Sequence, residues 1–309
     1  MHQASSSHTQ PKRARRTGVA LPRPSTLLEG AGDVWDVISK KGLIPERTLE
    51  PTRQCGDMVA QIEALGWGKL CNITTPASPK LVREFYSNLS VTEGNVVRVR
   101  NVSVNISPAA LNAYLGIPEP ENDDYFNLTI QPQWEEWIRL LAYPGATYKT
   151  KTVHGQLVPS FLPISSVNRF AKAWQYFICA SILPNLRPHQ LDHQRLALLA
   201  CIVTGKGINI GRLLRERFLF CARRDTDVTL GHGGLITKLF LDARLKIPNS
   251  EQRAQLGAPI NEEKIMKLPQ WKHGQAHPRG WGFTYVPERY QVGPNASIFD
   301  EPDIEQPKD

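Results

Sequence analysis

Five aspartates could supply the carboxylates of a metal-dependent nuclease or transposase, in which several acids converge on metal ions about 4 Å apart. The sequence pattern places them in loops or on helix surfaces, and it shows no mixed sheet whose strand ends would bring them together. Magnesium-dependent cleavage by Asp123, Asp225 or Asp242 therefore stays open as an alternative function without a visible scaffold. The five residues are Asp123, Asp124, Asp225, Asp227 and Asp242.

Two further patterns come close to catalytic motifs but lack a required residue. His189 and His193 have the spacing of zinc hydrolases, yet the glutamate that acts as the base between the two histidines is absent. Residues 204–207 contain the Gly-Lys step of a phosphate-binding loop, but they lack its first glycine and its magnesium-binding hydroxyl. We therefore expect a surface or capping histidine pair, a helix end at 204–207, no catalytic residue and no cofactor.

Cysteine usage and the absence of a leader indicate an intracellular protein. The cysteines are odd in number and widely spaced, and no Cys-x-x-Cys pair fixes two zinc ligands, so we expect reduced core thiols. The sequence shows no secretory signal and no apolar run of about 18 residues, so we expect no membrane partner. The cysteines are Cys55, Cys71, Cys179, Cys201 and Cys221.

The formal net charge of +8 is unevenly distributed. Residues 1–30 carry +4, and the residues from Pro287 onward carry −4, so the segment between them carries the remaining +8. A basic folded body favours a polyanionic partner, although a charge of this size also occurs in proteins that bind none.

Six arginines form two candidate phosphate-binding patches, which would make DNA or RNA the partner. Arg98 and Arg100 lie on an expected hairpin, and the other four surround one expected helix. The alternative interpretation is a solvated face whose charge is partly compensated by Glu216 and Asp225. The four helical candidates are Arg212, Arg215, Arg223 and Arg224.

The two ends of the chain are expected to be disordered. Residues 1–32 are rich in Ser, Pro, Arg and Gly, and residues 292–309 are acidic, so neither segment can bury enough apolar surface to fold. The basic tail contains a cluster of the kind that nuclear import receptors read, which favours nuclear localisation, with a cytoplasmic protein as the alternative. That cluster is Lys12, Arg13, Arg15 and Arg16.

Residues 33–291 show mostly helical periodicity, which predicts a mainly α, single helical globular domain. Ser78-Pro79 and Ser107-Pro108 each supply an N-cap with proline at the first helical position. Residues 96–106 instead alternate apolar with polar, which predicts a small β-hairpin turning near Arg100 and Asn101. The expected helices cover residues 33–38, 56–65, 79–89, 108–115, 132–142, 168–183, 191–203, 210–223 and 234–245, and residues 271–290 are expected to form a surface strap.

An ordered series of segments resembles the family named putative plant transposon protein domain, a transposase-like, retroelement-derived group. The series begins with residues 81–89 (LVREFYSNL), the hairpin and residues 106–117 (ISPAALNAYLGI). Residues 183–191 (LPNLRPHQL), 195–199 (RLALL) and 207–211 (GINIG) continue it, so the core of the match spans about residues 55–250. The resemblance implies an origin in mobile elements, but it names no reaction and carries no catalytic residue onto this sequence.

Together these observations predict a transposon-derived protein that binds nucleic acid and has no catalytic site. Two alternatives stay open: the divergent transposase or nuclease described above, and a gag-like structural protein that forms a homo-oligomer through its helical core. Convergent carboxylates would favour the enzyme, a large exposed apolar patch would favour self-association, and a continuous basic groove would favour nucleic acid.

Overall fold

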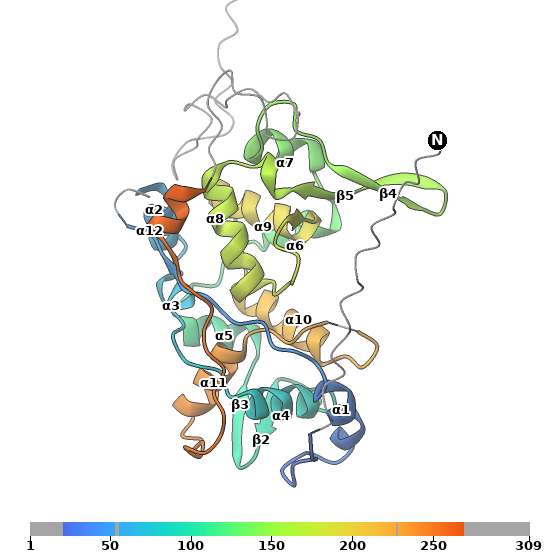
Figure 1. The fold of residues 1–309 in the computed structure, drawn as a ribbon, viewed down its shortest axis with the longest axis vertical. Helices are drawn as coiled ribbons and strands as arrows, with labels where there is room; N and C mark the ends of the chain where they lie inside the picture. Colours follow the sequence, from blue (N-terminus) through green and yellow to red (C-terminus); the bar gives the residue numbers. More distant parts are fainter. Residues whose placement is uncertain (1–20, 53–55, 227, 269–309) are drawn as a thin grey trace, which may run out of the picture.

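The computed structural model describes residues 21–52, 56–226 and 228–268, and these residues form the mainly helical fold that the sequence predicts. The helices gather at two ends of an elongated body (Figure 1). The lower end in Figure 1 contains α1 (Ala31–Ile38), α4 (Pro79–Leu89) and α11 (Gly233–Asp242). The upper end contains α2 (Gly56–Ala64), α6 (Asp124–Ile130), α7 (Trp134–Leu141), α8 (Arg169–Phe177), α9 (His193–Thr204) and α12 (Glu262–Lys267), while α3 (Gly68–Cys71), α5 (Pro108–Leu115) and α10 (Ile210–Ala222) lie between.

Side-chain caps lie at the start of most of the long helices, and those at Ser78 and Ser107 were predicted from the sequence. The hydroxyl of Ser78 accepts a hydrogen bond from the backbone N–H of Leu81 at the start of α4, and Ser107 does the same for α5. Asn168, Asp192 and Asn209 cap α8, α9 and α10 in the same way. Such caps satisfy donors that the first helical turn leaves unpaired, so they fix where each helix begins.

One continuous hydrophobic core joins the two ends. The helix predicted over residues 191–203 is confirmed as α9, and every side chain from Arg195 to Ile202 is buried in the core. Aromatic rings fill the remaining space edge to face, with Trp67 and Trp174 at 5.8 Å between centroids and Phe85 and Phe218 at 5.5 Å. A core of this extent makes the described helices a single packed unit.

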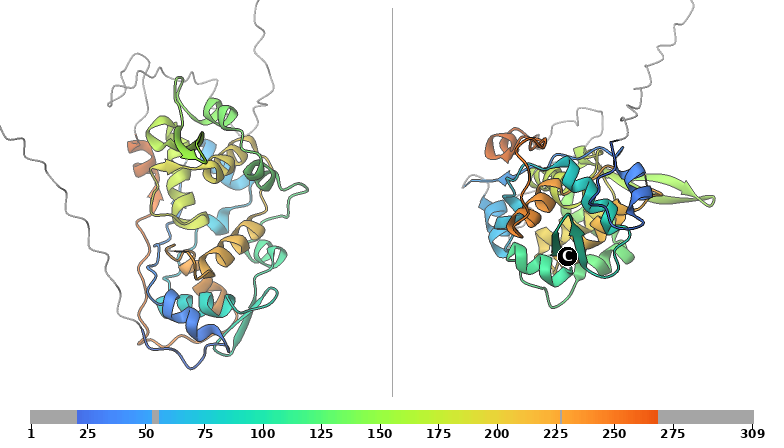
Figure 2. Two further views of the ribbon diagram at one scale, coloured as in Figure 1. Left: turned by 90° about the vertical axis from the view of Figure 1, so that its right-hand side faces the viewer. Right: turned by 90° about the horizontal axis from the view of Figure 1, so that it is seen from below.

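The predicted hairpin is present as β2 (Val96–Val99) and β3 (Val102–Asn105), which leave Arg100 and Asn101 as the turn. A second antiparallel sheet was not predicted. It consists of β4 (Lys149–Val153), β5 (Gln156–Pro163) and the short β6 (Gln190–Leu191), in the order β4-β5-β6. The β4–β5 ribbon projects from the upper end of the body in both Figure 1 and the right-hand view of Figure 2.

Two extended segments from opposite parts of the chain run side by side between the two ends (Figure 1). They include β1 (Leu49–Glu50) and β7 (Ile260–Asn261), which pair in parallel. The backbone N–H of Gly257 also donates to the carbonyl of Glu46 at 2.8 Å. These bonds tie the residues before α2 to the residues that lead into α12.

The beginning of the described chain differs from the expected tail boundary at residue 32. Thr26 donates to a carboxylate oxygen of Glu84 at 2.9 Å, and the backbone N–H of Leu28 donates to Asn88 at 3.0 Å. The first helix starts at Ala31, before the expected start at residue 33, and Gly30 in the left-handed region is its N-cap. Residues that looked polar and tail-like in sequence therefore contact α4.

Several expectations fall outside the described residues, namely those on residues 1–20 and 269–309, which include the basic cluster, the strap and the acidic tail. Within the described ranges, no helix is long and apolar enough to cross a membrane. The four cysteines described there, Cys71, Cys179, Cys201 and Cys221, are free thiols and buried. Burial raises the pKa of the Cys71 and Cys201 thiols to about 12, so these sulfurs stay protonated.

Candidate nucleic-acid interface

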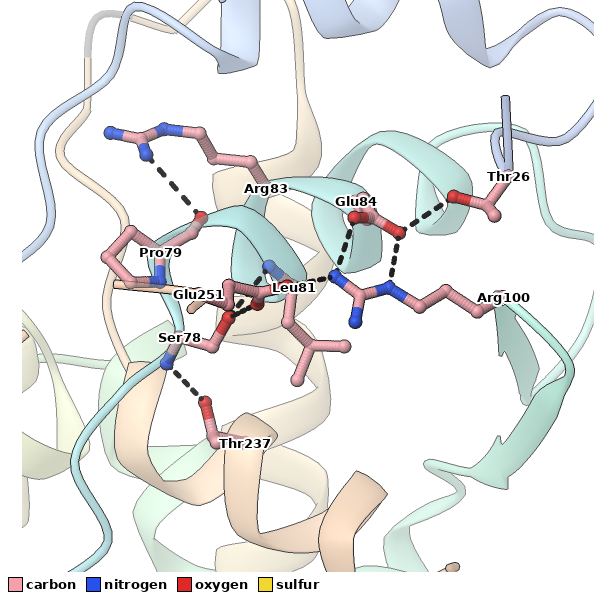
Figure 3. A network of polar contacts seen from close by, with 9 residues as sticks. All are labelled: Thr26, Ser78, Pro79, Leu81, Arg83, Glu84, Arg100, Thr237 and Glu251. Atoms are coloured by element: carbon pink, nitrogen blue, oxygen red, sulfur yellow. Dashed lines mark hydrogen bonds and ion pairs between the residues drawn. The ribbon is translucent and has the colours of Figure 1, made fainter. Parts of the chain in front are cut away.

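Arg100 lies at the β2–β3 turn and is held by two carboxylates (Figure 3). Its guanidinium donates to Glu84 of α4 at 3.0 and 3.2 Å and to Glu251 at 2.9 Å. The side chain of Glu84 is completely buried and that of Arg100 is 16% exposed. Two negative charges therefore surround this one positive charge, so Arg100 offers no net positive potential to a phosphate.

The same polar network continues into the start of α4 and into α11 (Figure 3). Ser78 donates its hydroxyl to Glu251, and its backbone N–H donates to the hydroxyl of Thr237 on α11 at 2.9 Å. Arg100 thus belongs to a cluster that joins α4, the β2–β3 hairpin, α11 and the segment around residue 251. Its role in the folded chain is to hold these elements together.

Arg212 is likewise held by the fold. Its guanidinium lies 3.2 Å from Asp123 and 3.1 Å from Glu216, and it stacks over the ring of Phe126 at 3.4 Å from the centroid. Asp123 caps α6, so these contacts dock α10 on α6. The charge of Arg212 is offset by two acids, as it is for Arg100.

Arg223 follows α10 and pairs with Asp225 at 2.6 Å, with both side chains more than half exposed. Exposed pairs of this kind contribute little to stability. Of the six candidates, Arg98, Arg215 and Arg224 have no carboxylate partner among the described residues. Arg98 and Arg224 are exposed, whereas Arg215 is half-buried and donates to the side chain of Asn95 at 2.6 Å, beside the hairpin that carries Arg98.

Apart from the adjacent Asp123 and Asp124 at the start of α6, the described candidate aspartates lie on different elements, and each of them has a local partner. Asp123 caps α6, Asp124 accepts the backbone N–H of Gly207 at 2.8 Å, and Asp242 accepts the hydroxyl of Tyr114 at 2.7 Å. Asp225 pairs with Arg223, and Asp227 lies outside the described residues. In the part of the chain that the structure describes, no three His, Cys, Asp or Glu side chains lie close enough together to hold a metal ion.

Two buried titratable groups lie at the start of α11. Glu46 accepts the backbone N–H groups of Gly234 and Leu235, and burial raises the pKa of its carboxyl to about 7. His232 is completely buried, with Nε2 3.1 Å from the carbonyl oxygen of Ile182. Burial lowers the pKa of its imidazole to about 3, so His232 is neutral near pH 7 and donates through Nε2.

One long basic stretch of the chain matches no sequence motif and was not predicted. Residues 137–191 contain six Lys and Arg residues and no Asp or Glu, whereas 29 acids in 309 residues would put about five in such a stretch. This acid-free stretch therefore carries +6 of the total +8. A count of acids along the chain would have found it.

Four of the six cations in the acid-free stretch are exposed, and they come from three neighbouring elements. They are Arg139 on α7, Lys149 and Lys151 on β4, and Arg187 before β6. The ring of Trp134 on α7 lies 5.6 Å from that of Tyr148 at the start of β4, and β5 pairs with both β4 and β6. The upper end of the body thus presents exposed positive charge with no acid in the same stretch of chain.

A family model described as "Putative plant retrotransposon-related domain" matches residues 63–246. The match covers more than half of the chain, and it includes all six arginine candidates and the whole acid-free stretch. No match was found among curated proteins or among solved structures.

Proposed function

The chain belongs to the family of plant retrotransposon-related domains, and on this premise we propose that it is a nucleic-acid-binding module derived from a mobile element. The element-derived origin follows from the family, and nucleic acid as the partner is our proposal. The contact is electrostatic and depends on phosphate groups, which supply most of the sequence-independent affinity of proteins for nucleic acids.

The observation that carries the proposal is the acid-free stretch 137–191, with +6 of the total charge and four exposed cations. The four exposed cations lie on neighbouring elements, so their fields add and attract a polyanion, although the acids of α7 and α12 lie at the same end of the body. The nearest acids in sequence, Glu136 and Asp192, flank the stretch at its two ends. This end of the body is therefore the surface on which we place the phosphates.

Three arginines outside the stretch support the same partner class. Arg98, Arg215 and Arg224 have no carboxylate partner within the described ranges, so their charges remain uncompensated. Arg100, Arg212 and Arg223 are paired, and we do not assign them to the contact surface. Arg98 lies on β2, and Arg215 and Arg224 lie on and just after α10, so these three arginines would form a second contact surface apart from the acid-free stretch.

The test is fluorescence anisotropy of the full chain with labelled duplex DNA, single-stranded DNA and single-stranded RNA at about 50 mM salt, where even non-specific binders engage. In the chain used for this test, Ala replaces Lys12, Arg13, Arg15 and Arg16, so that the basic cluster does not contribute to the measured affinity. We expect binding to at least one nucleic acid. Failure of this variant to bind any of them would overturn the proposal and would direct attention to self-association.

A variant in the acid-free stretch locates the contact. Arg139→Glu combined with Arg187→Glu reverses two exposed charges and is expected to weaken binding about tenfold or more, since each lost phosphate contact removes one counterion-release step. Lys246→Glu combined with Lys80→Glu makes the same change at two exposed lysines outside the stretch and serves as the control. Equal losses of affinity in both double variants would show that binding depends on net charge alone and not on the acid-free stretch.

We also propose that the basic cluster Lys12, Arg13, Arg15 and Arg16 is recognised by a nuclear import receptor. Its support is the density of cationic side chains in a short segment of chain. A fluorescent fusion of the full chain should accumulate in plant nuclei, and replacement of the four residues by Ala should remove that accumulation. Equal nuclear fluorescence of both fusions would contradict the assignment.

A further inference from the structure

The β4–β5 ribbon is the part of the acid-free stretch that stands furthest from the body (Figure 1). Every residue from Lys149 to Leu157 is exposed, and Leu157 is 73% exposed. The strands are joined by His154 and Gly155, which both have positive φ, at 49° and 80°. Two such residues form the tight turn whose twist matches that of a hairpin, so the ribbon ends in a narrow tip.

The base of the ribbon is fixed to the body. Leu162 of β5 is fully buried and pairs with Leu191 of β6. Tyr148, which directly precedes β4, packs its ring against Trp134. A ribbon anchored in this way is held at a defined angle to the body, which lowers the conformational entropy lost when it binds.

The two faces of the ribbon differ in chemistry. Successive side chains along β4 point to opposite faces, so Lys149 and Lys151 share one face, although the register with β5 shifts between Lys149 and Thr150. Thr150, Thr152 and Leu157 project from the other face. Cationic and hydroxyl side chains are those that most often contact phosphates, and a short apolar side chain can contact a thymine methyl group.

We propose that the β4–β5 ribbon lies in the major groove of duplex DNA. This groove is about 12 Å wide and admits a two-stranded ribbon. The lysine face reaches the phosphates of the groove wall, and the threonine face meets the base edges. The inference rests on the proposed function and adds to it the element that enters the nucleic acid and the duplex form that it selects.

The chemistry of the ribbon favours duplex DNA over two other occupants. The major groove of duplex RNA is deep and too narrow for side chains to read, so a ribbon of this kind cannot enter it. A second copy of the chain could add a strand at the free edge of β4, but lysines on an edge strand oppose such pairing. Lys149 and Lys151 lie on that edge.

The test compares Lys151→Glu and Thr152→Glu with Lys246→Glu, in the full chain with the four tail residues replaced by Ala. The two ribbon residues are exposed, and Lys246 is an exposed residue that follows α11 at the opposite end of the body (Figure 1). The expected result is tighter binding of duplex DNA than of duplex RNA of the same sequence. Each ribbon variant should lose about tenfold in affinity for duplex DNA, and the control should lose much less.

The outcomes separate this inference from the proposed function. Binding that the ribbon variants leave unchanged, or that favours duplex RNA, overturns the ribbon assignment while the proposed function stands. A ribbon variant that lowers the oligomeric state in sedimentation without weakening DNA binding also overturns it, because the ribbon would then contact a second copy. If the chain with an unsubstituted ribbon binds neither duplex, the ribbon assignment is overturned, and the proposed function is overturned only if single-stranded DNA and RNA also fail to bind.

Discussion

The buried carboxylate of Glu84 and the guanidinium of Arg100 form a two-point ion pair, at 3.0 and 3.2 Å, between the middle of α4 and the turn of the β2–β3 hairpin (Figure 3). A carboxylate that is removed from water is costly unless a partner compensates it. Because Glu251 approaches the same guanidinium, removal of Arg100 would leave two acids facing each other.

Arg100→Ala should therefore destabilise the fold by about 3–5 kcal/mol, the usual cost of breaking a buried ion pair from one side. Denaturant unfolding followed by circular dichroism measures this loss. The matched control is Arg98→Ala on the same hairpin, which removes an exposed arginine and should change stability by less than about 0.5 kcal/mol. Equal stability of the two variants would contradict the structural role of Arg100.

Gly211 should tolerate no side chain, because α10 packs directly on the start of α5. A Cβ atom at this position would lie 2.0 Å from the carbonyl oxygen of Pro108. We expect Gly211→Ala to cost about 3 kcal/mol or more, since backbone atoms must move apart. Gly68→Ala is the control, because its Cβ would meet open space at the start of α3, and thermal unfolding should show no loss of stability.

Glu46 should make the protein less stable as pH rises. Burial raises the pKa of its carboxyl from 4.5 to about 7, so the folded state binds this proton more tightly than the unfolded state does. The contribution is fully present below pH 4.5 and is lost as pH rises through about 7, at up to about 1.4 kcal/mol per pH unit. Unfolding of Glu46→Gln, measured at several pH values, should lack this slope, and an identical slope would contradict the prediction.

His232 should have the opposite effect. Burial lowers the pKa of its imidazole from 6.5 to about 3, so its contribution is fully present above pH 6.5 and is lost as pH falls toward 3. His232→Asn keeps a residue that tolerates the left-handed backbone, here at φ 55°, but it removes the titrating group. Below pH 6.5 the variant should lose less stability than the natural chain, and parallel curves would show that His232 does not titrate.

The helical part of the fold was predictable because its signals are local. Ser78-Pro79 and Ser107-Pro108 specify the starts of α4 and α5 within a few residues. Apolar residues on nearly every side of the segment indicate the buried helix α9. The β4–β5 sheet was missed because both faces of its outer part are exposed, so β4 (KTKTV) has no apolar alternation. A strand without a buried face lacks the period-2 pattern on which such predictions depend.

The candidate interface was predictable only in part, because charge pairing depends on residues far apart in the chain. Arg100 meets Glu251, 151 residues away, and Arg212 meets Asp123, 89 residues away. No sequence spacing could indicate that these two arginines are compensated. The acid-free stretch can be counted directly in the sequence, but sequence motifs are defined by the residues they contain and do not reveal a lack of acids.

The most direct test of the account is the salt dependence of duplex DNA binding by the full chain with its four basic tail residues changed to Ala. Each phosphate that the protein neutralises lowers the slope of log K against log salt concentration by about 0.9. If the four exposed cations of residues 137–191 contact phosphates, the slope should be about −3 to −4. A slope near zero, or no binding at about 50 mM salt, would contradict the claim that these four cations bind duplex DNA.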